Sequence, residues 1–216
     1  MGRLVNGLNG PFTGKAGSVI GSSRNGIPYI KGPYKSRTKN ISEKEELSRR
    51  KFADAQAWLK PTVAFVRIGF KGYSVKSEGF IAAKSYLMKN ALTVEDGEIV
   101  IDPALVKLSH GNLPMSPDAS FRLTAPDKLT ITWNPETPVN GDDKDQIMIL
   151  AYNCKDYKLK PGDVSILITG QFRGAGEDIL SIDVQKPGTV LHIYIAFVAA
   201  DRSRQSDSLY LGELTI

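Results

Sequence analysis

The sequence predicts a mainly β protein of the α+β class, built from three parts. The first 42 residues contain no Asp or Glu, seven Lys or Arg and eight Gly, which is typical of an extended arm without a core of its own. Apolar residues then recur at helical spacing, and from residue 93 they recur with the period of two that strands require. The predicted parts are a Gly-rich basic arm at 1–41, a helical segment with short strands at 42–115 and a β-sandwich at 116–216.

The arm is expected to be extended and rich in turns, because glycine and proline interrupt it too often for a helix. After Gly2, glycines recur at positions 7, 10, 14, 17, 21, 26 and 32, and prolines stand at 11, 28 and 33. Between them lie apolar residues that need a surface to pack on: Val5, Phe12, Val19, Ile20, Tyr29, Ile30 and Tyr34. The arm either lies along its own domain as short edge strands, or adds a strand to the sheet of a neighbouring subunit.

Charge is distributed unevenly along the chain. The net charge is +5, but residues 1–90 carry 17 basic and 5 acidic residues, whereas residues 91–216 carry 11 basic and 18 acidic residues. The basic half can attract nucleic acid, another anionic surface or the acidic half of a second copy. The third choice needs no foreign ligand and fits a self-assembling protein.

A capping box, Ser42-Glu43-Lys44-Glu45, marks the start of the helical segment. Pro61 then kinks this helix or begins a second one, and the dense apolar run at 63–70 is predicted to be a buried helix. A third helix is predicted over Lys76–Leu92, although Gly79 weakens it by about 1 kcal/mol relative to alanine. The apolar face of the first helix is formed by Phe52, Ala55 and Leu59, flanked by Trp58.

Short strands are predicted at Glu98–Asp102 and at Leu105–Ser109. Seven further strands at regular spacing, separated by Pro, Gly, Asn and Asp turns, are the pattern of a β-sandwich. They are predicted at Ser120–Leu123, Leu129–Asn134, Gln146–Asn153, Val164–Phe172, Ile179–Val184, Val190–Ala199 and Ser208–Ile216. The predicted core includes Leu129, Ile131, Trp133, Ile195 and Phe197.

The sequence offers little support for catalysis, so no enzyme, cofactor or metal site is expected. The stretch Gly10–Ala16 is one residue too short for a phosphate-binding loop and lacks its hydroxyl residue. His110, His192 and Cys154 show no zinc-ligand spacing. Three aspartates follow Asn140-Gly141 without the glycine and glutamate of a calcium loop, so a solvated turn is predicted there: Asp142, Asp143 and Asp145.

The single cysteine excludes an intrachain disulfide, and a small buried residue is the expected role of Cys154. No apolar signal region and no run of about 18 apolar residues is present, so synthesis in the cytosol without membrane insertion is expected. Such a chain can still be incorporated into a virion or another particle.

The arm is the candidate interaction site. Phe12, Val19, Ile20, Tyr29 and Ile30 are predicted to dock on a protein, either another copy or another particle subunit. Arg24, Lys31, Lys35 and Arg37 are predicted to steer that association by charge. In the alternative interpretation, the basic residues and the interleaved tyrosines bind nucleic acid without sequence preference.

Several stretches resemble an uncharacterised family of small Bacteroidota proteins, with relatives of the N-terminal part in other bacteria and their mobile elements. The resemblance implies a C-terminal part similar to fibronectin type III or immunoglobulin-like sandwiches, and the association with mobile elements implies a virion or particle component. It implies no activity. The stretches that carry it are Gly14–Ser23, Arg50–Phe52, Arg67–Tyr73, Asn90-Ala91, Tyr194–Val198 and Ser206–Gly212.

Overall fold

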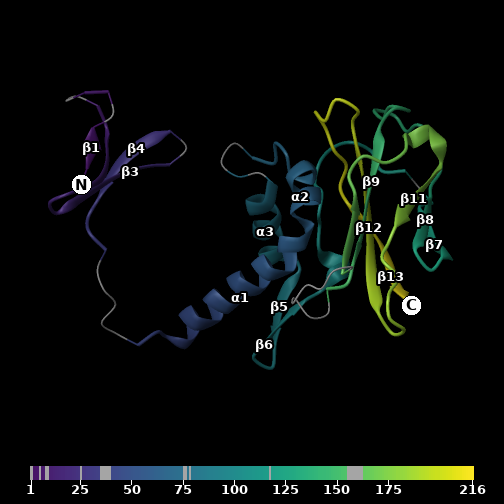
Figure 1. The fold of residues 1–216 in the computed structure, drawn as a ribbon, viewed down its shortest axis with the longest axis horizontal. Coiled ribbons are helices and arrows are strands. Elements are labelled where there is room, and N and C mark those ends of the chain that lie inside the picture. Colours follow the sequence, from purple (N-terminus) through teal and green to yellow (C-terminus); the bar gives the residue numbers. More distant parts are fainter. Residues whose placement is uncertain are drawn as a thin grey trace. The chain divides into compact units, whose positions relative to one another are not determined.

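The computed structural model describes residues 2–4, 6–7, 10–24, 26–34, 40–74, 77, 79–116, 118–154 and 163–216 (Figure 1). The chain divides into two compact units, Met1–Ser42 and Glu43–Ile216. As predicted, the fold is mainly β and contains several antiparallel sheets.

The N-terminal unit is a four-stranded sheet in the order β1-β2-β3-β4, where the sequence predicts an extended arm (Figure 1, purple). Its strands are β1 (Arg3–Leu4), β2 (Phe12–Ala16), β3 (Val19–Arg24) and β4 (Ile27–Lys31). Gly17 and Gly26 both have positive φ, which allows tight turns between successive strands. The glycines that argue against a helix therefore serve hairpins, and the strands pair with one another.

The helical segment contains α1 (Glu43–Leu59), α2 (Val63–Gly69) and α3 (Gly79–Asn90), with a 3₁₀ turn at Lys60–Thr62 between the first two. The first helix begins directly after Ser42, and Pro61 lies at the start of the 3₁₀ turn. The third helix begins at Gly79, which has a φ of +57°. Its predicted start at Lys76 lies outside the described residues.

A hairpin follows the helices, formed by β5 (Leu92–Glu95) and β6 (Glu98–Ile101). No strand forms at Leu105–Ser109, so the prediction of a strand there is wrong. Asp102 caps a 3₁₀ turn at Pro103–Leu105 by accepting from the Ala104 amide, and irregular backbone follows.

The C-terminal strands form two antiparallel sheets, ordered β10-β9-β12-β13 and β11-β8-β7. All seven predicted strands are present, most of them within two residues of their expected bounds, although the predicted Val164–Phe172 ends at Leu167. They are β7 (Ser120–Ala125), β8 (Lys128–Thr132), β9 (Gln146–Tyr152), β10 (Val164–Leu167), β11 (Glu177–Ser181), β12 (Val190–Val198) and β13 (Leu209–Thr215).

The central strands of the β10-β9-β12-β13 sheet are buried on both faces, because helices cover one face and the β11-β8-β7 sheet covers the other (Figure 1). Side chains of β9 and β12 alternate between these layers. Met148, Leu150, Tyr152, Tyr194, Ala196 and Val198 share a core with the helices. Ile147, Ile149, Ala151, Ile193, Ile195 and Phe197 share the other core with β8, including Leu129, Ile131 and Trp133.

The helical core thus crosses the boundary predicted between residues 115 and 116, and Glu43–Ile216 forms one compact unit. Trp58 of α1 packs edge-on against Tyr152 of β9, with ring centroids 5.1 Å apart, and the Tyr152 hydroxyl donates to the Trp58 carbonyl at 2.9 Å. Among the described residues, none of the helices combines the length and apolar character needed to span a bilayer.

Candidate interaction surface

The N-terminal sheet has almost no core of its own. Of its described residues, Gly21 alone is buried. Several large apolar side chains are exposed, including Ile27 at 71%, Ile30 at 66% and Tyr34 at 82%. Because so small a unit buries too little apolar surface to be stable alone, the sheet is suited to packing against a partner.

The pairing register divides the hairpins of this sheet into two faces, because directly paired residues point to the same side and neighbours along a strand point to opposite sides. One face, here called the basic face, carries Lys15, Ile20, Ser22, Arg24, Ile27, Tyr29 and Lys31. The other, here called the apolar face, carries Ala16, Val19, Gly21, Ser23, Pro28 and Ile30.

The apolar face adjoins a hollow of about 390 Å³, whose lining includes Phe12, Pro28 and Ile30. Phe12 reaches this position because Gly21 lets the backbones approach closely: a Cβ at Gly21 would lie only 2.0 Å from the Phe12 carbonyl oxygen. Phe12 and Ile30, both predicted as docking residues, therefore lie at one concave apolar site.

The basic face brings together Arg24, Tyr29 and Lys31, which the sequence predicts as interaction residues, and adds Lys15 and Ile27. The Lys31 ammonium donates to the Tyr34 hydroxyl at 2.7 Å and lies 4.6 Å from the centre of its ring. This hydrogen bond raises the pKa of Lys31 and lowers that of Tyr34. Val19 and Ile20, although adjacent, fall on opposite faces. Lys35 and Arg37 lie outside the described residues.

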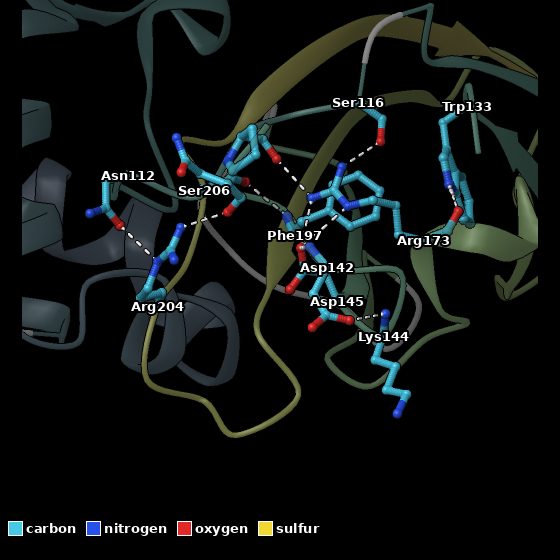
Figure 2. A network of polar contacts seen from close by, with 12 residues as sticks. Asn112, Ser116, Trp133, Asp142, Lys144, Asp145, Arg173, Phe197, Arg204 and Ser206 are labelled. Carbon is cyan, nitrogen blue, oxygen red and sulfur yellow. Dashed lines mark hydrogen bonds and ion pairs between the residues drawn. The ribbon is translucent and has the colours of Figure 1, made fainter. Parts of the chain in front are cut away.

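A second polar centre lies in the C-terminal unit and corrects the prediction of a solvated aspartate turn (Figure 2). Asp142 and Asp143 are exposed, but Asp145 is buried and pairs with Arg173, whose Nη2 atom lies 3.2 Å from the Asp145 Oδ2 atom. The Arg173 guanidinium also donates to the Ser116 hydroxyl at 2.6 Å and to the Pro114 carbonyl at 2.8 Å.

The rest of this centre is apolar and closed. The Arg173 guanidinium lies 4.0 Å from the centre of the Phe197 ring, and the Trp133 indole donates to the Arg173 carbonyl at 2.7 Å. Burial lowers the pKa of Arg173, and the charge of Asp145 opposes that change. Because the Arg173 guanidinium bonds to groups at residues 114, 116 and 145, the centre holds these segments together.

Comparison with known families assigns the chain to a group. The sequence pattern of a family of unknown function, DUF6266, matches residues 11–212. The chain belongs to the DUF6266 family. No protein of curated function matches it in sequence.

The DUF6266 match runs from Pro11, directly before β2, to Gly212 in β13, so it includes strands β2 to β4 and the Arg173 centre. The described residues among the predicted interaction residues lie on both faces of the N-terminal sheet, a division that the sequence analysis did not predict. The register of Gly21 with Ile30 would have shown that division, since it fixes which residues share a side. Arg173, whose partner Asp145 lies 28 residues away in the chain, was not predicted either.

Proposed function

We propose that this DUF6266 protein is a non-enzymatic structural or interaction protein that assembles through its N-terminal sheet. The observation that carries the proposal is the apolar face, which exposes Ile30 and adjoins the hollow at Phe12. Its occupant is another copy of the chain or another subunit of the same particle, such as a virion. A second copy fits the charges, because the first 42 residues carry no acidic residue whereas residues 91–216 are acidic overall.

The C-terminal strands have the second role in this proposal. Their two sheets make an immunoglobulin or fibronectin type III-like sandwich, and this sandwich is the binding or decorating module that the assembled N-terminal units anchor. The cores on the two faces of β9 and β12 support this division of roles, because none of their residues comes from the N-terminal sheet.

Measurement of molar mass against concentration tests this proposal. The full chain is expected to form larger species as concentration rises, and a chain lacking residues 1–41 is expected to stay monomeric. Ile30→Ser removes an apolar side chain from the apolar face, and Ile27→Ser is its matched control because it makes the same change at an exposed residue of the opposite face. Assembly should be lost in the first variant and kept in the second. A full chain that remains monomeric refutes assembly through a second copy. Assembly that survives deletion of residues 1–41 refutes the role of the N-terminal sheet.

A second function is favoured by the basic face, where Lys15, Arg24 and Lys31 lie on the same side as Tyr29. Such a surface suits sequence-independent nucleic-acid binding, because cations contact phosphates and an exposed aromatic ring can stack on a base. In this case Lys31→Gln weakens binding to DNA and reduces its dependence on salt, whereas Ile30→Ser leaves both unchanged. Absence of salt-dependent DNA binding by the full chain excludes this second function.

A further inference from the structure

A polar hollow of about 480 Å³ lies in the C-terminal unit, where the end of α2 meets the segments 106–113 and 203–208. The residues that line it include Lys71, Tyr73, His110, Asn112, Arg204 and Gln205. All of these residues belong to Glu43–Ile216, whereas the surface on which the proposed function depends belongs to Met1–Ser42.

The walls of this hollow are held in place by backbone and side-chain hydrogen bonds. The Gln205 amide donates to the carbonyls of Lys71 and His110, each at 2.9 Å. The His110 amide donates to the Gly69 carbonyl at 2.8 Å. At Gly111 the chains approach so closely that a Cβ would lie 2.0 Å from the Gln205 carbonyl oxygen. The lining side chains therefore project from a preorganised frame.

Asp207 lies next to the His110 ring. The His110 Nδ1 atom is buried and lies 2.9 Å from the Asp207 Oδ1 atom, while the ring as a whole is half-exposed. The same carboxylate binds the Lys107 ammonium and accepts from the Gly111 amide at 3.1 Å.

The two permanent cations of the hollow are bound to neutral oxygens. Arg204 donates to the Asn112 side chain at 3.3 Å and to the Asn140 carbonyl at 3.0 Å (Figure 2), and Lys71 donates to the Arg202 carbonyl at 2.9 Å. Within the described part of the chain, neither cation has a carboxylate within ion-pair distance. The Asp201 carboxylate accepts hydrogen bonds from the Ser203 hydroxyl and amide, and these bonds lower its pKa more than the charge of Lys71 does.

We propose that this hollow binds an oxyanion, the carboxylate or phosphate group of a small ligand. Arg204 and Lys71 supply the positive charge, and His110, Tyr73 and Asn112 supply further polar groups. Guanidinium and ammonium groups that lack a carboxylate partner gain charge-assisted hydrogen bonds when an oxyanion enters. No Asp or Glu is among the described residues that line the hollow. The nearby Asp207 carboxylate is bound by the Lys107 ammonium and the Gly111 amide.

Titration of the full chain with inorganic phosphate or with acetate, at constant ionic strength, tests the proposal. The readout is the ring resonances of the two histidines by NMR, with His192 as an internal reference because it lies in β12 and not in this hollow. The His110 signals are expected to shift and saturate with a millimolar dissociation constant, while the His192 signals stay constant. A response to phosphate alone, to acetate alone or to both supports the site and identifies the anionic group that it accepts.

Variants then locate the binding. Arg204→Gln is expected to weaken binding at least about tenfold, or about 1.4 kcal/mol. Lys144→Gln is the matched control, because Lys144 is exposed and does not line this hollow. If Arg204→Gln fails to fold, Lys71→Gln serves instead, since Lys71 is exposed. Constant His110 signals with both anions, or an equal loss in Lys144→Gln, overturns the proposal.

Discussion

Arg173 and Asp145 form an ion pair in which both side chains are almost fully withdrawn from solvent, with relative exposures of 0% and 2%. Removal of one partner leaves an uncompensated buried charge, which typically costs about 3–5 kcal/mol. We expect Asp145→Asn to lower the free energy of unfolding by an amount of this order, measured by urea denaturation. Asp143→Asn is the control in the same turn, because Asp143 is exposed. Equal stability of the two variants would contradict the interpretation of Asp145 as a structural anchor.

The same pair allows a double-mutant cycle. Replacement of both residues by leucine removes both charges together, so no unpaired charge stays buried. The double variant Arg173→Leu/Asp145→Leu is therefore expected to lose less stability than the sum of the two single variants. The Pro114 carbonyl and Ser116 hydroxyl still lose their donor, so a residual loss is expected. Strict additivity would show that the two side chains do not stabilise each other.

Gly21 offers a test of the N-terminal sheet that leaves its charge and its exposed side chains unchanged. A Cβ at this position meets the Phe12 carbonyl oxygen at 2.0 Å, whereas a Cβ at Gly32 meets nothing within 4 Å. We expect Gly21→Ala to displace β2 from β3 at a cost of about 1–3 kcal/mol, and Gly32→Ala to have little effect. Hydrogen exchange of the β2–β4 amides is the measurement. Unchanged protection in Gly21→Ala would mean that Phe12 does not pack over this glycine.

Acid should weaken the contacts around Asp207. Burial alone raises the pKa of its carboxyl, but the hydrogen bonds from Lys107 and the Gly111 amide, together with the nearby charges, outweigh burial and hold the pKa below the ordinary value of 3.8. A carboxyl with a lowered folded-state pKa stabilises the fold above its unfolded pKa, and this contribution disappears as the pH falls through the folded value. We therefore expect the stability of the native chain to decline as the pH falls toward and below 3.8.

Asp207→Asn should make that decline shallower, because asparagine has no proton to take up in this range. The measurement is the free energy of unfolding of both proteins from neutral to acid pH. Exposed Asp183 provides a control, and Asp183→Asn should leave the slope unchanged. If the free energy of unfolding of Asp207→Asn falls with pH as steeply as that of the native chain, other carboxyls cause the acid sensitivity.

The C-terminal strands could be predicted because their pattern is local. Alternation in Leu129–Trp133 places three apolar side chains on one side, and all three are buried in the core between the sheets. The continuous apolar runs of β9 and β12 predict buried strands, but their sequence does not say what covers the second face. The helical layer covers this second face, although the sequence predicts the helices as a separate part. The contact of Trp58 with Tyr152 joins residues 94 positions apart, and no local pattern reports it.

The N-terminal sheet and the polar centres were harder to predict for a different reason. Glycine lowers strand propensity, so the hairpins at Gly17 and Gly26 look like an extended arm until the register is known. Charged residues near turns are usually solvated, and Asp145 differs from Asp143 only through its distant partner. His110 and Asp207 likewise come together from separate segments. Propensity and spacing cannot detect such pairs, because they arise only when the fold is complete.

Cys154 provides a final test of the C-terminal core. Burial raises the pKa of its thiol to about 11, and an interaction with Trp58 opposes this only in part. Near pH 8 such a thiol is about one-thousandth ionised, roughly a hundredfold less than an ordinary cysteine, and only the thiolate reacts. We expect the folded chain to react with a disulfide reagent at least about a hundredfold more slowly than the same chain in concentrated guanidinium chloride. Since Cys154 is the only cysteine in the sequence, the signal reports this site alone. Equal rates in the two conditions would show that the thiol is open to solvent and that the core next to α1 is looser than described.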